Sequence, residues 1–150
     1  MSSNLICKIL NKDSIHYNQA VLLAKEVLQK PLGLKFSEKE IEQEEQNILV
    51  AGFLEDALCA TATMTREDDK IFLQHLAVKQ DLQNKGIGSQ LLQFCEEFAI
   101  QNQSRVIYAN ARDGAGKTPV NFFIKNEYFC GEEEFFVDNL PHKIVWKILT

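Results

Sequence analysis

The amino-acid sequence predicts one α/β (α+β) domain over residues 1–150, with its elements in the order β-α-α-β-β-β-α-β-α-β-β. Stretches with alternating apolar residues and stretches with helical periodicity follow one another without an internal repeat, linker or low-complexity segment. The 150 residues, 45% hydrophobic and 25% charged, suit a soluble globular domain with its own core. A glycine-containing turn joins one of these strands directly to a helix.

The first half of the chain is predicted to hold two helices and four strands. Pro31 and Gly33 follow a helical pattern and end it. The S-x-x-E spacing of Ser37 and Glu40 is typical of a capping box and predicts the start of a second, acidic helix. The predicted elements are a strand over 5–10, helices over 14–29 and 37–46, a hairpin of strands over 47–53 and 57–65, and a strand over 71–78.

The second half is predicted to contain two further helices and three strands. The helix after the glycine turn has an apolar face with Leu91, Cys95 and Phe98 and a polar face with Gln93 and Glu97. This division is typical of a surface helix packed on a core. The predicted elements are helices over 89–100 and 118–126 and strands over 105–109, 129–137 and 143–149.

Charge and cysteine content narrow the class of protein. A net charge of −5, without a basic stripe, argues against nucleic acid as a partner. The four cysteines stand singly, without a C-x-x-C pair, and are expected to be free thiols in a reducing cytoplasm. Residues 1–4 lack the basic and the long apolar regions of a signal peptide, and no apolar run in the sequence approaches the roughly 20 residues needed to span a bilayer. We therefore expect a cytoplasmic protein with no membrane partner.

The turn from Gln83 to Gly88 is the segment that points to a function. It lies between a predicted strand and a predicted helix, where unpaired N–H groups and the macrodipole at the helix N-terminus favour an anion. Gly86 and Gly88 let the chain turn sharply and let a ligand approach the main chain, because neither has a Cβ. Lys85 adds a positive charge. The turn is therefore predicted to hold phosphate.

Four segments of the chain resemble segments of a known protein family. Residues 73–78 (LQHLAV) and 83–92 (QNKGIGSQLL) closely resemble the acetyl-CoA-binding motif of the GNAT superfamily of acetyl-CoA-dependent N-acetyltransferases. Residues 27–34 (VLQKPLGL) and 136–142 (FVDNLPH) resemble segments of a bacterial subgroup of poorly defined substrate. The resemblance covers nearly the whole chain. It implies the GNAT acyl-CoA N-acyltransferase fold, a mixed central sheet flanked by helices, with which the predicted order of elements agrees.

The resemblance also implies a coenzyme A site. In the family the turn binds the CoA pyrophosphate, and the preceding strand meets the pantetheine arm through its main chain. The residues carried over are Lys85, Gly86, Ile87, Gly88 and Ser89 for the phosphates, Gln83 and Asn84 for the shape of the turn, and Ala77 and Val78 for pantetheine. The N–H of Val78 would also polarise the thioester carbonyl.

The implied function is direct transfer of an acetyl group from the cosubstrate acetyl-CoA to a primary amine of a small molecule or peptide, with no metal ion. An alkyl ammonium has a pKa of about 10.4, so a base or a chain of water molecules must take its proton near neutral pH. A homodimer is a reasonable expectation. The alternative is a GNAT domain that binds CoA without catalysis, as a sensor or interaction module.

The usual general acid of the family is a tyrosine in the word F-Y-x-K-x-G-F, from which residues 122–128 (FFIKNEY) depart. Phe123 stands at the tyrosine position and Glu127 at the glycine position. Tyr128, Tyr108, a water molecule or no protein acid at all are the alternatives. A thiolate with a pKa of about 8.5 can leave without full protonation, so activity does not require the tyrosine.

His75 and His142 are the candidate bases. Alternation along a strand predicts that His75 lies on the opposite face from Gln74 and Val78. Strand-borne bases of the family lie on the Gln74 face, which favours a structural role for His75. His142 precedes the last predicted strand. It is either a base near the acceptor or a residue that orients the preceding turn through Asp138.

A second glycine-rich word offers a different function. Residues 111–118 (ARDGAGKT) match a relaxed P-loop after a predicted strand, and 135–138 (FFVD) resemble a magnesium-binding strand end. Together they would suit an ATP or GTP phosphotransferase. Only residues 119–150 follow, too few for the parallel βαβ units of such a site. A surface loop with a solvated Lys117 is therefore the preferred interpretation.

Overall fold

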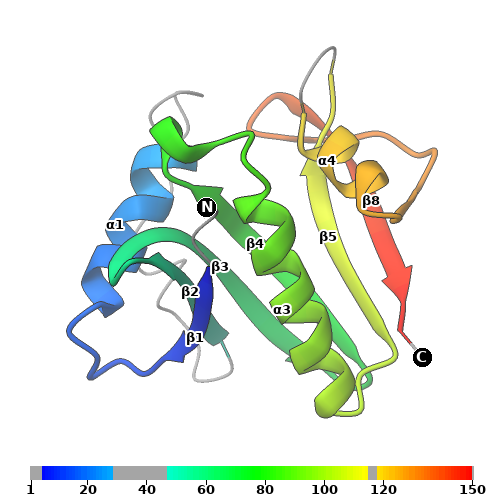
Figure 1. Cartoon of the computed structure of the whole chain (residues 1–150). Coiled ribbons are helices and arrows are strands. Elements are labelled where there is room, and N and C mark those ends of the chain that lie inside the picture. The colour runs from blue at the N-terminus through cyan, green and yellow to red at the C-terminus, as the bar shows by residue number, and fades with distance from the viewer. Residues whose placement is uncertain (1–4, 29–46, 115–117, 150) are drawn as a thin grey trace.

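The computed structural model describes residues 5–28, 47–114 and 118–149, which form a mixed sheet flanked by helices (Figure 1). The predicted fold class is confirmed, whereas the helix predicted over 37–46 lies outside the described residues. The strands are β1 (Ile6–Leu10), β2 (Asn47–Leu54), β3 (Ala57–Glu67), β4 (Lys70–Val78), β5 (Val106–Arg112), β6 (Phe129–Cys130), β7 (Phe135–Val137) and β8 (Leu140–Ile148). The helices are α1 (Tyr17–Leu28), α3 (Ile87–Gln101), α4 (Pro119–Lys125) and the 3-10 helix η1 (Gln80–Leu82).

The parallel pair of strands lies in the middle of the sheet. The strand order is β1-β2-β3-β4-β5-β8-β6, and β7 pairs with β8. β4 and β5 run parallel, and the other pairs in the described part of the chain run antiparallel. Parallel neighbours need a long crossover connection, which α3 supplies here. The carboxyl ends of β4 and β5 therefore lie at the same edge of the sheet.

The helices α1 and α3 cover opposite faces of the sheet. Val50 packs in the apolar core beneath α3, whereas its neighbours Leu49 and Ala51 pack with α1. Because side chains alternate along a strand, these two cores lie on the two sides of β2. Leu91 of α3 and Ile107 of β5 are both 0% exposed. Burial of this apolar face fixes α3 across the centre of the sheet.

The strand predicted over 129–137 is wrong, because β6 and β7 are separate strands. β8 also begins earlier than predicted, at Leu140. Asp138 and Asn139 form the tight two-residue turn between β7 and β8, with φ of +50° and +65°. Aspartate and asparagine tolerate this left-handed conformation better than most residues, so this dipeptide was a usable turn signal.

The phosphotransferase alternative is wrong. Residues 115–117 of the P-loop-like word lie outside the described residues, but the surrounding topology is clear. β5, which precedes the word, is followed by the seven-residue helix α4 and has the antiparallel β8 as its next neighbour. A P-loop is built on successive parallel βαβ units, which this half of the sheet does not form.

Candidate active site

β4 and β5 begin as a hydrogen-bonded pair and then separate. The register of the pair ends at Leu73 and Ala109, although β4 continues to Val78 and β5 to Arg112. The two strands therefore diverge toward their carboxyl ends, as Figure 1 shows. We name the main chain beyond the last pair, residues 74–78 and 110–112, the β4–β5 split.

The main chain of Val78 faces this split. The N–H of Lys79 donates to the Cys59 carbonyl of β3 at 2.8 Å. Main-chain groups of successive residues in a strand point to opposite sides, so the N–H and carbonyl of Val78 point away from β3. The Gln83 side chain donates to that carbonyl at 2.9 Å. The N–H of Val78 is therefore the donor that the end of β4 presents to the split.

A β-bulge interrupts the alternation predicted for β4. Thr63 of β3 pairs with Gln74, but Thr61 pairs with Ala77, so β4 has one more residue than β3 across this stretch. His75 lies within the bulge and adopts a left-handed conformation with φ of +54°. A left-handed first residue is one of the ways in which a strand accommodates such an insertion.

The bulge reverses the faces of β4 beyond it. Val78 packs in the α3 core together with Leu73, so the prediction that Val78 shares the face of Gln74 is wrong. The extra residue shifts the two-residue period of the strand by one position. Histidine is among the residues enriched in left-handed backbone, but one histidine within a strand pattern does not by itself predict an extra residue, which appears only in the pairing with β3.

The start of α3 is open to an anion. α3 begins at Ile87, directly after Gly86, whose φ of +82° is left-handed. The first bond of the helix runs from the N–H of Gln90 to the Gly86 carbonyl at 3.1 Å, so the helix itself does not use the amides of residues 87–89. No side chain caps this end, and the first turn carries no acidic residue.

The two glycines of the turn differ in their surroundings. A Cβ on Gly86 would meet no atom within 4 Å, so the main chain there is accessible to a ligand. A Cβ on Gly88 would lie 3.3 Å from the Phe122 ring of α4 and 3.6 Å from Val78. Gly88 thus lets α4 pack on the start of α3, a role that sequence reasoning missed.

The structure brings the predicted cofactor residues together at one place. The bond from Gln83 to Val78 folds the turn back onto the end of β4. Asn84 is left-handed, with φ of +65°, and contributes to the shape of the turn. Lys85 is exposed, whereas the Ile87 side chain is buried in the core, so Ile87 can offer only its main chain to a ligand.

α4 carries Phe123 at the position of the family's tyrosine. Phe123 is 5% exposed and packs edge-on against Phe122 and Tyr128, with ring centroids 5.2 and 5.0 Å apart. Glu127, at the family's glycine position, has a φ of +71°, a conformation that glycine adopts freely. This agreement supports the alignment of residues 122–128 with the family motif.

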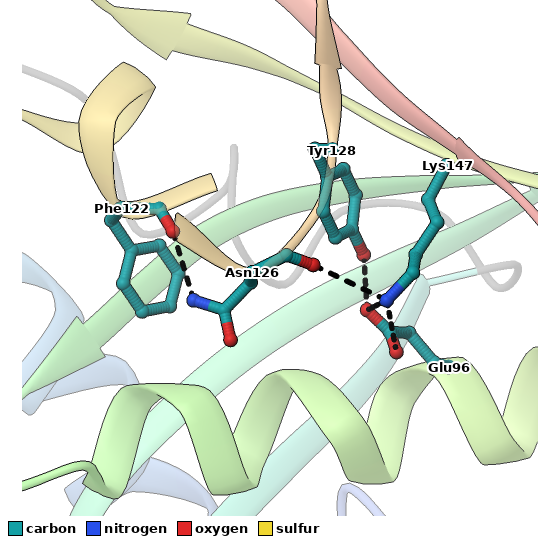
Figure 2. A network of polar contacts seen from close by, with 5 residues as sticks. All are labelled: Glu96, Phe122, Asn126, Tyr128 and Lys147. Atoms are coloured by element: carbon teal, nitrogen blue, oxygen red, sulfur yellow. Dashed lines mark hydrogen bonds and ion pairs between the residues drawn. The ribbon is translucent and has the colours of Figure 1, made fainter. Parts of the chain in front are cut away.

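Tyr128 is held in the interior of the protein. Its phenol donates a hydrogen bond to Glu96 Oε2 at 2.7 Å (Figure 2). Burial, together with the charge of Glu96, raises the pKa of the phenol far above its ordinary value. A phenol whose proton is bound to a carboxylate on α3 is a poor donor to a departing thiolate. The prediction of Tyr128 as a catalytic residue is therefore not supported.

Tyr108 lies before the start of the split and far from Val78. It lies opposite Phe72, before the strands separate, and the two rings stack 4.9 Å apart. Its phenol donates to Glu67, and burial together with this bond raises the pKa of Tyr108 to about 12. A strand rises about 3.3 Å per residue, so Tyr108 lies roughly 20 Å from Val78.

The two candidate bases lie in different settings. His142 lies on β8 opposite Arg112, and its Nδ1 is 2.8 Å from the Leu140 carbonyl oxygen. A carbonyl only accepts, so Nδ1 carries the proton and Nε2 of the neutral ring is an acceptor. The bond reaches Leu140 and not Asp138, the partner that the sequence suggested. Burial lowers the pKa of His75, which makes His75 the weaker base.

Solved structures resemble the chain along nearly its whole length. An aminoglycoside 6′-N-acetyltransferase complexed with coenzyme A has a TM-score of 0.78 at 17% identity, covering 95% of this chain and 96% of that one. An acyl-CoA N-acyltransferase from Pseudomonas aeruginosa has 0.77 at 14%, covering 97% and 99%. A Bacillus subtilis acetyltransferase in complex with CoA has 0.74 at 14%, covering 98% and 100%. At these identities the likeness shows the fold.

None of the curated proteins compared with the chain matches it. Within the described residues, no helix is both long and apolar enough to cross a bilayer. Residues 13–125 match the model of the acetyltransferase (GNAT) family, and this region contains the β4–β5 split, the glycine turn and α4. The resemblance seen in the sequence is confirmed, and the chain belongs to the GNAT family of acetyltransferases and is an acyltransferase enzyme.

Proposed function

We propose that the protein transfers the acetyl group of acetyl-CoA to a primary amine of a small molecule or peptide. The observation that carries this proposal is the direct succession of the β4–β5 split and the uncapped start of α3, joined by the bond from Gln83 to Val78. Two of the compared acetyltransferase structures contain CoA, which supports the same cosubstrate here.

The start of α3 suits the diphosphate of CoA. The amides of residues 87–89 and the helix dipole favour an anion, and the exposed Lys85 supplies a countercharge. The space in front of Gly86 is open, since a Cβ added there would meet no atom within 4 Å. The diphosphate would thus bind through main-chain donors that no acidic side chain of the first turn opposes.

The end of β4 suits the pantetheine arm. Ala77 pairs with Thr61 of β3, so its main chain takes part in the sheet, whereas Val78 faces the split. An arm that begins at the glycine turn meets Val78 first. The N–H of Val78 is therefore the nearest main-chain donor for the arm and for the thioester oxygen. A donor at that oxygen stabilises the negative charge that develops in the transition state.

Starting from the neutral amine, the transfer needs one proton acceptor and no change of oxidation state. The amine nitrogen attacks the thioester carbonyl carbon, and a C–N bond forms as the oxygen becomes negative. When the carbonyl reforms, the C–S bond breaks and the sulfur leaves with the electron pair. A thiolate with a pKa of about 8.5 leaves without a positioned phenol, which is compatible with Phe123. The proton lost by the amine goes to a base.

His142 is the favoured base. Ala111 packs in the α3 core, so Arg112 and its register partner His142 lie on the opposite face of the sheet. An amine that enters the split from that face can pass its proton to Nε2, directly or through water. His142→Gln should lower kcat/KM near neutral pH by about 10²- to 10⁴-fold with unchanged CoA affinity. His16→Gln, at the start of α1, is the control and should keep wild-type turnover.

Thiol release from acetyl-CoA with a panel of amines tests the function. The panel should contain alkyl diamines, peptides with a free amino group, and aminoglycosides, since one of the compared structures is an aminoglycoside 6′-N-acetyltransferase. We expect at least one amine to raise thiol release well above hydrolysis and to gain an acetyl group by mass spectrometry. Tight CoA binding with no acetylated amine in the panel would instead favour a CoA-binding module.

A further inference from the structure

A polar cluster that the proposed chemistry does not use joins three elements of the fold (Figure 2). Glu96, in the middle of α3, accepts hydrogen bonds from Tyr128 at 2.7 Å and from Lys147 of β8 at 3.3 Å. The Lys147 ammonium also lies 5.4 Å from the centre of the Tyr128 ring. The side chains of Glu96 and Lys147 are 15% and 27% exposed, so solvent screens the ion pair only in part. We name these three residues the Glu96 cluster.

The Glu96 cluster holds the carboxyl end of α4. Lys147 Nζ donates to the carbonyl of Asn126, the C-cap of α4, at 3.2 Å. The Asn126 side chain donates in turn to the Phe122 carbonyl at 2.8 Å. A cation in this position satisfies a carbonyl that the helix leaves unbonded and interacts favourably with the helix dipole. Glu96 thereby links α3 to the end of α4 through one lysine.

The Phe122 side chain of α4 packs on the proposed cofactor site. The Phe122 ring lies 3.3 Å from the position that a Cβ would take on Gly88, and Val78 lies 3.6 Å from the same position. Phe122 therefore packs where the first turn of α3 meets the end of β4. This is the junction between the proposed diphosphate and pantetheine sites, so a displacement of α4 would change its shape.

We propose that Glu96 is a positioning residue for CoA binding. Through Lys147 and Tyr128 it fixes α4 against α3, and the Phe122 ring transmits that position to the cofactor site. Neutralising Glu96 leaves the partly buried ammonium of Lys147 without its carboxylate. Removing one partner of such a pair costs more free energy than the intact pair contributes to stability, because the remaining charge is uncompensated. The inference rests on the proposed function, because CoA is taken as the ligand of the site.

Calorimetry with CoA on the full chain tests this role. Glu96→Gln keeps the shape of the side chain and removes its charge, and it should raise the Kd for CoA roughly tenfold. Tyr128→Phe keeps the ring and the ion pair and should raise the Kd less. Glu67→Gln is the matched control, because Glu67, the last residue of β3, also accepts from a tyrosine but lies beside the amino end of β4, where β4 and β5 are still paired. It should keep the wild-type Kd.

A double-mutant cycle separates positioning from general destabilisation. Phe122→Ala should itself raise the Kd for CoA, and in that background Glu96→Gln should have no further effect, because the ring that transmits the position is gone. Strictly additive changes in binding free energy would overturn the proposal. So would a Glu96→Gln variant that loses stability in denaturant but keeps the wild-type Kd.

Hydrogen exchange supplies a readout that needs no cofactor. Glu96→Gln should speed exchange of the α4 amides while the central amides of α3 keep their wild-type rates. Unchanged exchange in α4 would reject the positioning role. If the wild type does not bind CoA, the proposed function fails, whereas the exchange rates still decide whether Glu96 positions α4.

Discussion

At the scale of single residues, Phe123 is the position where this chain departs from its family in a chemically important way. Its ring is buried between Phe122 and Tyr128, and Glu127 adopts the left-handed conformation expected of the motif's glycine. The motif is therefore present in shape but lacks the phenol. Tyr128 and Tyr108 both donate their phenol protons to glutamates elsewhere. The thiolate is therefore expected either to take a proton from water or to leave unprotonated.

Phe123→Tyr should maintain or raise turnover. A phenol restored at the family's acid position could protonate the thiolate, which is worth about 10²- to 10⁴-fold where that step limits the rate and nothing where it does not. Steady-state thiol release against pH, with the best amine of the panel, measures the effect. A large fall in turnover with unchanged folding and CoA affinity would show that Phe123 packs against the acceptor instead.

His75 should make the stability of the protein depend on pH. Burial lowers the pKa of His75 in the folded protein below the ordinary value near 6.5, so the unfolded chain takes up the proton first as the pH falls. The free energy of unfolding is therefore at its full value above about pH 6.5, and it decreases as the pH falls below that value. His75→Asn, which tolerates the left-handed backbone, should flatten the free energy of unfolding between pH 7.5 and roughly pH 5. Parallel profiles for the two proteins would refute this.

At the scale of elements, the glycine turn and α3 could be predicted because their signals are local. Two glycines, a lysine and a helical apolar pattern occur within one short segment, and the structure places Gly86 in the left-handed conformation at the helix start. The resemblance to the family added that the preceding strand meets the pantetheine arm through its main chain. Local chemistry thus located the candidate site before any long-range contact was known.

The features that could not be predicted depend on contacts between distant segments. The bulge at His75 is visible only in the register between β3 and β4. The packing of Phe122 on Gly88 and the bond from Tyr128 to Glu96 join residues more than 30 positions apart in the chain. Periodicity within a strand or helix carries no information on such pairs.

At the scale of the whole molecule, the order of elements sufficed for the fold class but not for the strand order. β8, the last strand, lies between β5 and β6, an arrangement that long-range pairing decides. The result is one parallel pair that opens at its carboxyl ends, with α3 starting beside one strand and α4 following the other. The proposed cofactor site is therefore a product of the topology and not of any single motif.

Binding of CoA to Gly86→Asn and Gly86→Asp measures whether the start of α3 binds the diphosphate of CoA. Both side chains tolerate the left-handed backbone better than most, and both enter open space, so the pair differs only in charge. Calorimetry should show that the Asp variant binds CoA roughly tenfold more weakly than the Asn variant, with a smaller difference at high salt. Equal affinities for the two variants, or no binding by the wild type, would contradict the account.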